Sequence, residues 1–310
     1  MRSACSLLVP AVLLLSVTGP ASHAQTAKID LTGGVPLVEV RIDGKGPFHF
    51  VVDTGTNCGA IVSPRLAKRL GLSSEGHAQI TDLGGRATHT LDEVSLDTVS
   101  LDGIEFHSVS AVVTDLPDGD AVFDGILGFR LFRGRLLTLD YPHHRLRVSD
   151  GVLAGSRNHD VVPMTMPGGI PVVDLAAGGT TIQAAVDSGG LGLSVPASVA
   201  QALRFSGSET IALGKTQVSD FTLAGGVLAG SIGLDGHRFE SPFVEVNPVF
   251  PIADLGSRAM ADFAVTFDQT SMLIEFSSGR TVHRLVKPSR PGAPPEEELI
   301  GVVYVKQTYD

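Results

Sequence analysis

Short apolar runs separated by turn residues make up most of this sequence, and they predict strands. Two of the runs, residues 50–52 and 184–186, each end in an aspartate, a small hydroxyl residue and a glycine. A short apolar run bounded by turn signals is typical of a buried strand, and the glycine marks the turn that ends it. The chain has 36 glycines, 18 prolines and few long helical patterns, so we expect an all-β fold.

The pattern around the first run recurs around the second. An apolar segment precedes each aspartate, at residues 35–40 and 170–175. A helical pattern with a proline at its start follows each one, at residues 64–70 and 196–203. Proline suits the first turn of a helix, so both patterns predict a short helix.

The repetition continues further along the chain. Ile126-Leu127-Gly128 corresponds to Asp254-Leu255-Gly256, and residues 137–140 correspond to residues 265–268, with the same step of 12 residues from glycine to aspartate in each copy. This period is too long for a solenoid repeat, so the sequence predicts two similar lobes that arose by duplication.

The two aspartates carry the candidate chemistry. Asp-[Ser/Thr]-Gly occurs only at Asp53 and at Asp187 in this chain, each time after three apolar residues. The strand delivers each carboxyl group to the end of a rigid element. Two carboxyl groups brought together in this way can activate water and hydrolyse a peptide bond.

These motifs and the paired apolar-glycine elements resemble those of aspartic peptidases of the pepsin and retropepsin clan, in their two-lobed, single-chain bacterial form. The resemblance covers about residues 28–277. It implies a bilobal pepsin/retropepsin-like fold with two similar β-barrel-like lobes and an active-site cleft between them. It also implies that Asp53 and Asp187 are the catalytic pair, supported by Leu127-Gly128 and Leu255-Gly256.

In such a pair one proton is shared, because two adjacent carboxyl groups cannot both ionise cheaply, and this family is the known example of the effect. The ionised aspartate takes a proton from water, and the protonated one donates to the scissile carbonyl oxygen. The resemblance therefore implies an aspartic-type endopeptidase that needs no metal, no cofactor and no covalent intermediate.

The residues that follow each aspartate are expected to shape the substrate site. Gly55 and Gly189 allow backbone N–H groups to approach the carboxylates, because no Cβ stands in the way. Thr56 is expected to hydrogen-bond across the lobe interface. The family usually has a second hydroxyl residue at the matching position, which here is Gly190.

Thr54 and Ser188 match the family's small hydroxyl position. They are consistent either with turn formation at a strand end or with a role in tuning the aspartates.

A covering hairpin is predicted at residues 80–88. Gly84 and Gly85 are flanked by alternating residues, which favours a tight turn, and we expect them to contact substrate. An ordinary surface hairpin fits the same pattern. The tyrosine that pepsin-like enzymes carry in this flap is absent, since the first tyrosine of the chain is Tyr141.

The expected domain organisation follows from the repeat and from the two ends of the chain. Residues 1–24 resemble a signal peptide, with an apolar run and small residues before a cleavage site, which predicts a secreted or periplasmic protein. Residues 25–150 form the N-terminal lobe and residues 151–285 the C-terminal lobe. Residues 286–310 form a Pro/Glu-rich linker and one terminal strand, which either pairs with the body or remains an exposed tail.

The net charge of −10 and the lack of basic clusters argue against nucleic acid as a partner, and no association with membranes is expected after signal cleavage. We expect a monomer that acts on peptides or proteins. The histidines do not fall into metal-ligand spacings, so no metal site is predicted.

Two other functions are compatible with the motifs. A catalytically weak or inactive descendant would bind extended peptides in the same cleft, and Gly190 and the absent flap tyrosine favour this alternative. A carboxylate-pair enzyme could instead act on a glycoside.

Overall fold

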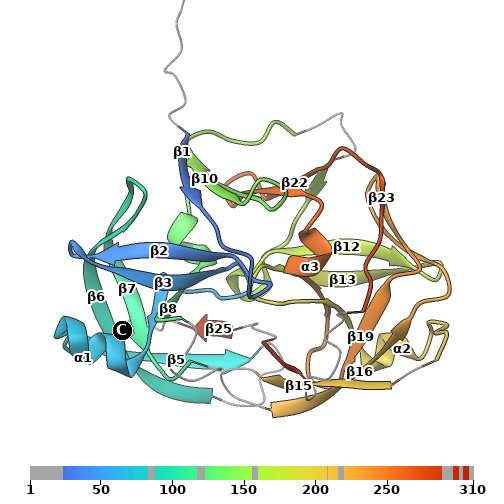
Figure 1. Ribbon diagram of the computed structural model, residues 1–310, viewed down its shortest axis with the longest axis horizontal. Coiled ribbons are helices and arrows are strands. Elements are labelled where there is room, and N and C mark those ends of the chain that lie inside the picture. The colour runs from blue at the N-terminus through green and yellow to red at the C-terminus, as the bar shows by residue number, and fades with distance from the viewer. Residues whose placement is uncertain are drawn as a thin grey trace, which may run out of the picture.

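The computed structural model describes residues 24–82, 88–116, 123–155, 160–207, 209–215, 220–287, 296–299 and 303–306. Within these residues the chain folds into two lobes, each built on one large β-sheet, and a third sheet joins them. Figure 1 shows the first lobe on the left, the second on the right and the joining sheet above them. The predicted all-β, bilobal fold is confirmed.

The first-lobe sheet contains the strand that ends in Asp53 and the strand that ends in Gly128. In the order of its hydrogen-bonded neighbours it consists of β2 (Leu37–Ile42), β3 (Lys45–Asp53), β8 (Gly125–Gly128), β4 (Ala60–Val62), β7 (Ile104–Val113), β6 (Thr88–Leu101), β5 (Gly76–Asp82) and β25 (Val303–Lys306). Helix α1 (Pro64–Leu70) lies where the proline predicted it. Ser63 caps its first turn, and Gly71 ends it in the left-handed conformation.

The second-lobe sheet repeats this arrangement and extends it. Its order is β23 (Val282–His283), β18 (His237–Glu240), β17 (Ser231–Leu234), β12 (Val172–Ala177), β13 (Thr180–Asp187), β20 (Ala253–Gly256), β14 (Leu193–Pro196), β19 (Phe243–Asn247), β16 (Asp220–Val227), β15 (Glu209–Lys215) and β24 (Glu296–Leu299). Two short helices, α2 (Ala197–Ala200) and α3 (Ser257–Met260), follow β14 and β20 directly.

The joining sheet takes strands from both halves of the chain. Its order is β1 (Gln25–Lys28), β10 (Arg145–Ser149), β9 (Leu136–Asp140), β21 (Ala264–Asp268), β22 (Leu273–Ser277) and β11 (Val161–Pro163). Short 3-10 turns occupy Phe129–Phe132, called η2, and Pro167–Gly169, called η3.

The joining sheet also records the duplication. Strands β9 and β21 are the matching strands of the two repeats, and they pair antiparallel with Thr138 opposite Thr266. The two threonine Oγ1 atoms are 2.9 Å apart. Because equivalent residues of equivalent strands face each other, the halves of this sheet are related by a local twofold axis that passes between the threonines.

Each aspartate stands at the buried end of its strand. β3 and β13 both begin with exposed residues and end with four consecutive buried ones, the last of which is the aspartate. Strands buried on both faces read as continuous apolar runs, which explains why the sequence shows an unbroken run at these two places.

The apolar-glycine elements support the aspartates as predicted. β3 pairs parallel with β8, so that Asp53 lies opposite Gly128, and β13 pairs parallel with β20, so that Asp187 lies opposite Gly256. One residue earlier in each pair of strands, Leu127 and Leu255 are almost completely buried.

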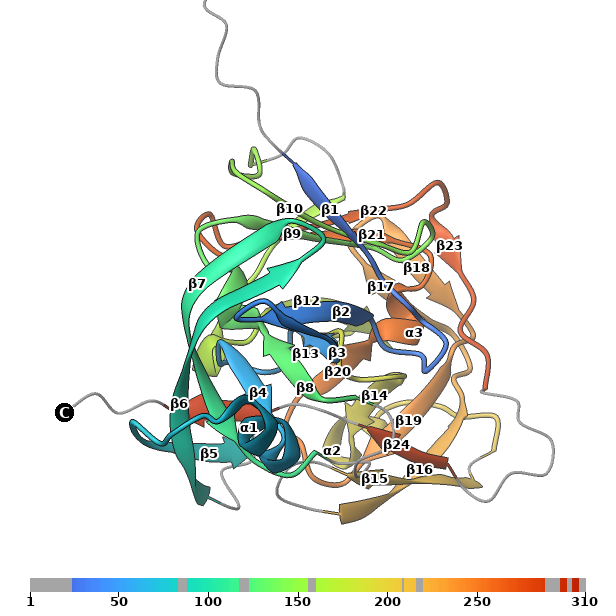
Figure 2. The same cartoon turned by 60° about the vertical axis from the view of Figure 1, so that its left-hand side comes forward.

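The C-terminal segment pairs with the body and forms two strands where the sequence predicted one. β24 runs parallel to β15 at the edge of the second-lobe sheet, and β25 runs antiparallel to β5 at the edge of the first-lobe sheet. Figure 1 shows β25 directly above β5, and Figure 2 shows β24 beside β15 and β16. Across the described ranges, no helix has both the length and the apolar character that a membrane crossing requires.

Leu127 offers a test of the support behind the first aspartate. Leu127→Ala should lower the free energy of unfolding by about 2–5 kcal/mol, because it opens a cavity at a fully buried position. Denaturant unfolding would measure the change. Val286→Ala, at a position that is 75% exposed, is the matched control and should change stability little. A small effect of Leu127→Ala would contradict the supporting role.

Candidate active site

Asp53 and Asp187 occupy equivalent places in their lobes, and both are buried. The backbone N–H of Gly55 donates to Asp53 Oδ1 at 2.8 Å, and the N–H of Gly189 donates to Asp187 Oδ1 at 2.8 Å. Each loop therefore turns back on its own carboxyl group, as the glycines predicted.

Four hydrogen bonds made by Thr54 and Ser188 lock the two loops together. Thr54 N–H donates to Ser188 Oγ at 3.0 Å, and Ser188 N–H donates to Thr54 Oγ1 at 2.9 Å. The Thr54 hydroxyl donates to the carbonyl of Val186 at 2.6 Å, and the Ser188 hydroxyl donates to that of Val52 at 2.7 Å. This reciprocal pattern gives the aspartate loops the same twofold relation as the joining sheet.

This lock corrects one expectation from the sequence. Thr56 was expected to bond across the lobe interface, but its hydroxyl donates to Asp53 Oδ2 at 2.6 Å within its own loop. The cross-lobe role belongs to the first hydroxyl position, where Thr54 and Ser188 are both present. The glycine at position 190 therefore leaves the lock complete.

Gly55 and Gly189 have a second role at the lobe interface. A Cβ on Gly189 would lie 2.5 Å from Asp53 Cγ, and a Cβ on Gly55 would lie 2.5 Å from Asp187 Oδ2. Each glycine thus packs against the carboxyl group of the opposite lobe. Any side chain at either position would push the two aspartates apart.

The outer oxygens of the two aspartates have different surroundings. Asp53 Oδ2 accepts the Thr56 hydroxyl, whereas Asp187 Oδ2 is buried and has no hydrogen-bond partner among the described residues. The matching loop position beside Asp187 is Gly190, which has no hydroxyl to offer.

The environment shifts both carboxyl groups in the same direction but to different extents. Burial raises the pKa of Asp53 to about 6, against which the hydrogen bonds from Thr56 and Gly55 and the contact with Asp187 act. Burial also raises the pKa of Asp187 well above its usual range, and the charges of Asp53 and Asp254 raise it further. Asp53 therefore ionises first, and Asp187 keeps its proton to higher pH.

The other predicted site residues have mixed outcomes. β5 and β6 pair antiparallel up to Thr81 opposite Thr88, as a hairpin at residues 80–88 requires. Gly84 and Gly85 themselves lie outside the described residues. No substrate is present, so contact of Gly55, Thr56 and Gly189 with a substrate stays a prediction.

A buried hydrogen-bond chain behind the second loop was missed by sequence reasoning. The Ser257 hydroxyl donates to the carbonyl of Ser188 at 2.7 Å and lies 3.0 Å from the hydroxyl of Tyr141. Burial raises the pKa of Tyr141, so this hydroxyl remains a neutral donor. A comparison of the two repeats could have indicated this chain. Ser257 directly follows Gly256, whereas the equivalent residue after Gly128 is the apolar Phe129.

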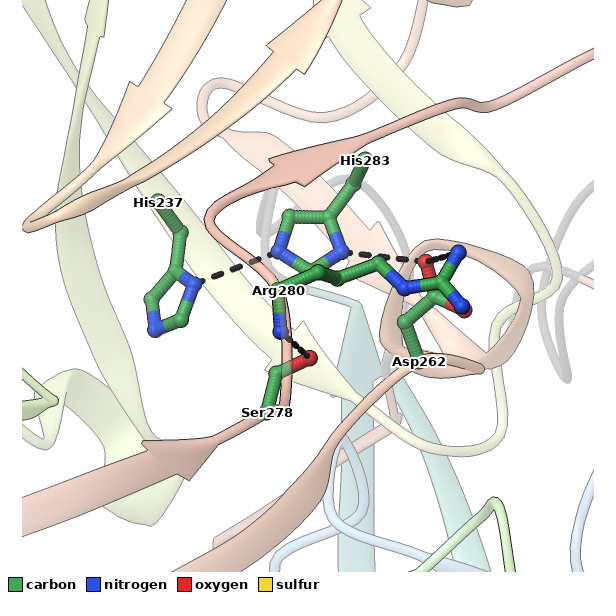
Figure 3. A network of polar contacts seen from close by, with 5 residues as sticks. All are labelled: His237, Asp262, Ser278, Arg280 and His283. Atoms are coloured by element: carbon green, nitrogen blue, oxygen red, sulfur yellow. Dashed lines mark hydrogen bonds and ion pairs between the residues drawn. The ribbon is translucent and has the colours of Figure 1, made fainter.

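A second buried polar group lies in the second lobe and involves two histidines (Figure 3). His237 Nδ1 is 3.2 Å from His283 Nε2, and His283 Nδ1 is 3.0 Å from Asp262 Oδ2. Burial lowers the pKa of His283, although Asp262 opposes this shift. These contacts fasten β23 to β18 and to the turn after α3. In the part of the chain that the structure describes, no group of three His, Cys, Asp or Glu side chains is arranged to hold a metal ion.

Comparison with known proteins agrees with this geometry. Residues 38–131 match the family model described as aspartyl protease. The fold is similar to that of the aspartic proteinase from Irpex lacteus, with a TM-score of 0.55 and 13% sequence identity, over 84% of this chain and 98% of that chain. A search of curated proteins gives no match. The family match and the shared fold confirm the resemblance to aspartic peptidases of the pepsin and retropepsin clan.

The cross-lobe lock can be tested through stability. Thr54→Val keeps the shape of the side chain but leaves Ser188 N–H and the Val186 carbonyl without their buried partner, so the free energy of unfolding should fall by about 2–4 kcal/mol. Thr26→Val, at an exposed position of β1, is the control and should be nearly neutral. Equal effects of the two substitutions in denaturant unfolding would rule out the lock.

The buried carboxyl groups predict an unusual dependence of stability on pH. The folded pKa of Asp53 lies above its ordinary value of 3.8, so its ionisation opposes folding as the pH rises through about 6. Asp53→Asn should therefore raise the free energy of unfolding at pH 7 by up to about 3 kcal/mol, and with it the melting temperature. The gain should vanish below about pH 4. Asp174→Asn, on an exposed position of β12, should show no such gain. A constant difference between Asp53→Asn and wild type at every pH would contradict this account.

Proposed function

We propose that this protein is an aspartic endopeptidase that hydrolyses peptide bonds with Asp53 and Asp187 as its catalytic pair. The observation that carries the proposal is the reciprocal packing of each aspartate against the glycine of the opposite loop. The Thr54 and Ser188 lock supports it, because the lock holds the two loops in register.

The different surroundings of the two carboxyl groups assign their roles. Asp53, which ionises first and has the Thr56 hydroxyl to stabilise its charge, acts as the general base that takes a proton from water. Asp187 keeps its proton and donates it to the scissile carbonyl oxygen. The proton that Asp53 has taken then passes to the leaving nitrogen. As the C–N bond breaks, the hydroxyl that received the proton of Asp187 returns it to Asp187 and becomes the carbonyl of the new carboxyl group, so the pair regains its starting state.

The substrate is an extended segment of peptide or protein. The edge of β5 and the edge of β15 each already accept an extended backbone, since β25 adds to the first and β24 to the second. Peptides that bind by strand addition obtain affinity from main-chain hydrogen bonds of this kind.

The glycosidase alternative has little support in this geometry. Glycosidases keep their two carboxyl groups about 5–9.5 Å apart to leave room for the sugar and water. In this protein each carboxyl group instead packs against the loop glycine beside the other aspartate, with no gap of that size at the contact.

The weak or inactive peptide-binding alternative loses its main argument. It rested on Gly190 as a missing half of the cross-lobe lock, and Thr54 and Ser188 supply both halves. Secretion or periplasmic location, a monomeric state and action without membrane or nucleic acid remain proposals that rest on the sequence.

The decisive experiment compares cleavage by wild type with cleavage by two isosteric variants. Asp53→Asn and Asp187→Asn should each abolish hydrolysis of a denatured protein substrate, because each removes one partner of the shared proton, while circular dichroism shows an intact fold. A statine-type peptide should inhibit wild type, because its hydroxyl occupies the place of the attacking water.

Asp174→Asn is the matched control and should cleave as wild type does. Full activity in either site variant would exclude the proposed mechanism. Equal peptide binding by wild type and variants, with cleavage by none of them, would establish the peptide-binding alternative.

A further inference from the structure

The twofold relation of the lobes makes their strands comparable residue by residue. In the first lobe, one row across strands β3, β8, β4 and β7 is entirely apolar. It consists of Val51, Ile126, Ile61 and Val112. The matching row across β13, β20, β14 and β19 contains two acids. It consists of Ala185, Asp254, Ser194 and Glu245.

The loops above these rows differ in a complementary way. The first loop carries Thr56 and Cys58, and the second loop carries glycine at the matching positions 190 and 192. A Cβ on Gly190 would lie 2.6 Å from Asp254 Oδ2 and 3.4 Å from Asp187 Oδ2. Asp254 thus occupies the space beside Asp187 that Thr56 occupies beside Asp53.

Gly192 and Glu245 show the same combination of a loop glycine and an acid from the sheet. A Cβ on Gly192 would overlap the Glu245 carboxylate, which therefore lies where the loop has lost a side chain. Asp254 and Glu245 are 3% and 2% exposed, so both acids belong to the interior of the second lobe. Two independent pairs, each coupling a glycine in the loop to an acid in the sheet, distinguish the second lobe from the first.

Four elements near Asp254 carry charged groups. Asp187 ends β13, which pairs directly with β20, and Glu245 lies on β19, two strands further along the sheet. Arg258 lies in α3, which follows β20, and Asp53 packs against Gly189 from the opposite loop. Arg258 Nη2 lies 3.7 Å from Glu245 Oε1.

We propose that Asp254 is a positioning residue of the aspartate pair: its carboxyl group fills the space beneath Gly190, and its negative charge keeps the shared proton on Asp187. This inference rests on the proposed function for its catalytic meaning. The charge of Asp254 does act on Asp187, whose pKa it raises in addition to burial and to the charge of Asp53.

The consequence is an acid and a base with fixed identities. A hydroxyl donor beside Asp53 favours the charged form of that carboxyl group, and a carboxylate beside Asp187 disfavours it there. A symmetric pair could exchange these roles, whereas this pair is built with a preferred proton position. Asp254 therefore determines which lobe supplies the proton donor.

The first test follows the titration of Asp187 directly. Carbon-13 NMR of labelled aspartate carboxyl groups would be recorded against pH for wild type and Asp254→Asn. Removing the neighbouring charge should move the Asp187 titration to lower pH by roughly one unit, and the Asp53 titration should move less. The alkaline limb of kcat/KM should move in the same direction.

Asp174→Asn serves as the matched control, since it removes a charge from an exposed position of the same lobe, and both profiles should stay as in wild type. An unchanged Asp187 titration in Asp254→Asn would overturn the proposal. Because the titration needs no turnover, a protein that cleaves no peptide but shows the shift would refute the proposed function and leave this inference intact.

The second test rebuilds the first-lobe arrangement in the second lobe. Gly190→Thr alone should lower the melting temperature, because its Cβ meets Asp254. Asp254→Ile alone should also lower it, because the space beside Gly190 loses the carboxyl group that fills it. The double variant places the Thr56 and Ile126 pair at these positions and should recover most of the loss. Additive losses in the double variant would overturn the proposed sharing of space.

Discussion

The molecule depends on holding two buried carboxyl groups against each other across an interface between lobes. Such an arrangement is unfavourable by itself, because burial disfavours charge and two adjacent charges repel. The Thr54 and Ser188 hydrogen bonds supply the restraint that counters this, since each hydroxyl both accepts a hydrogen bond from the opposite loop and donates one to the strand that leads into that loop. Each loop is therefore satisfied only when the other is in place.

The same constraint explains why so many small residues surround the pair. Gly55 and Gly189 have to be glycine because the opposite carboxyl group occupies the place of a Cβ. Leu127 and Leu255 are buried behind the strand ends and prevent the loops from retreating into the lobes. Glycines therefore lie at the contact between the lobes, and large apolar residues lie one layer behind them.

Within this nearly symmetric frame, the surroundings of the two aspartates differ through a local departure from symmetry. Asp53 has the Thr56 hydroxyl beside it, and Asp187 has the carboxyl group of Asp254. A duplicated fold gives two equivalent acids, whereas the proposed hydrolysis needs one base and one acid. Replacing a hydroxyl in the loop with a carboxyl group from the sheet is a small change that would separate these two proposed roles.

The sequence by itself determined the strands, the two lobes and the two aspartates that meet across the lobe interface, because these depend on local signals: apolar runs, turn glycines and a repeat that can be read along the chain. It assigned the lock to Thr56, one position too late, and it treated Gly190 as a loss, because a single chain does not show which hydroxyl points across an interface. It also matched Asp254 to Ile126 without showing what lies above either residue. Only the tertiary structure decided these points, since they depend on which atoms from distant strands share one small space.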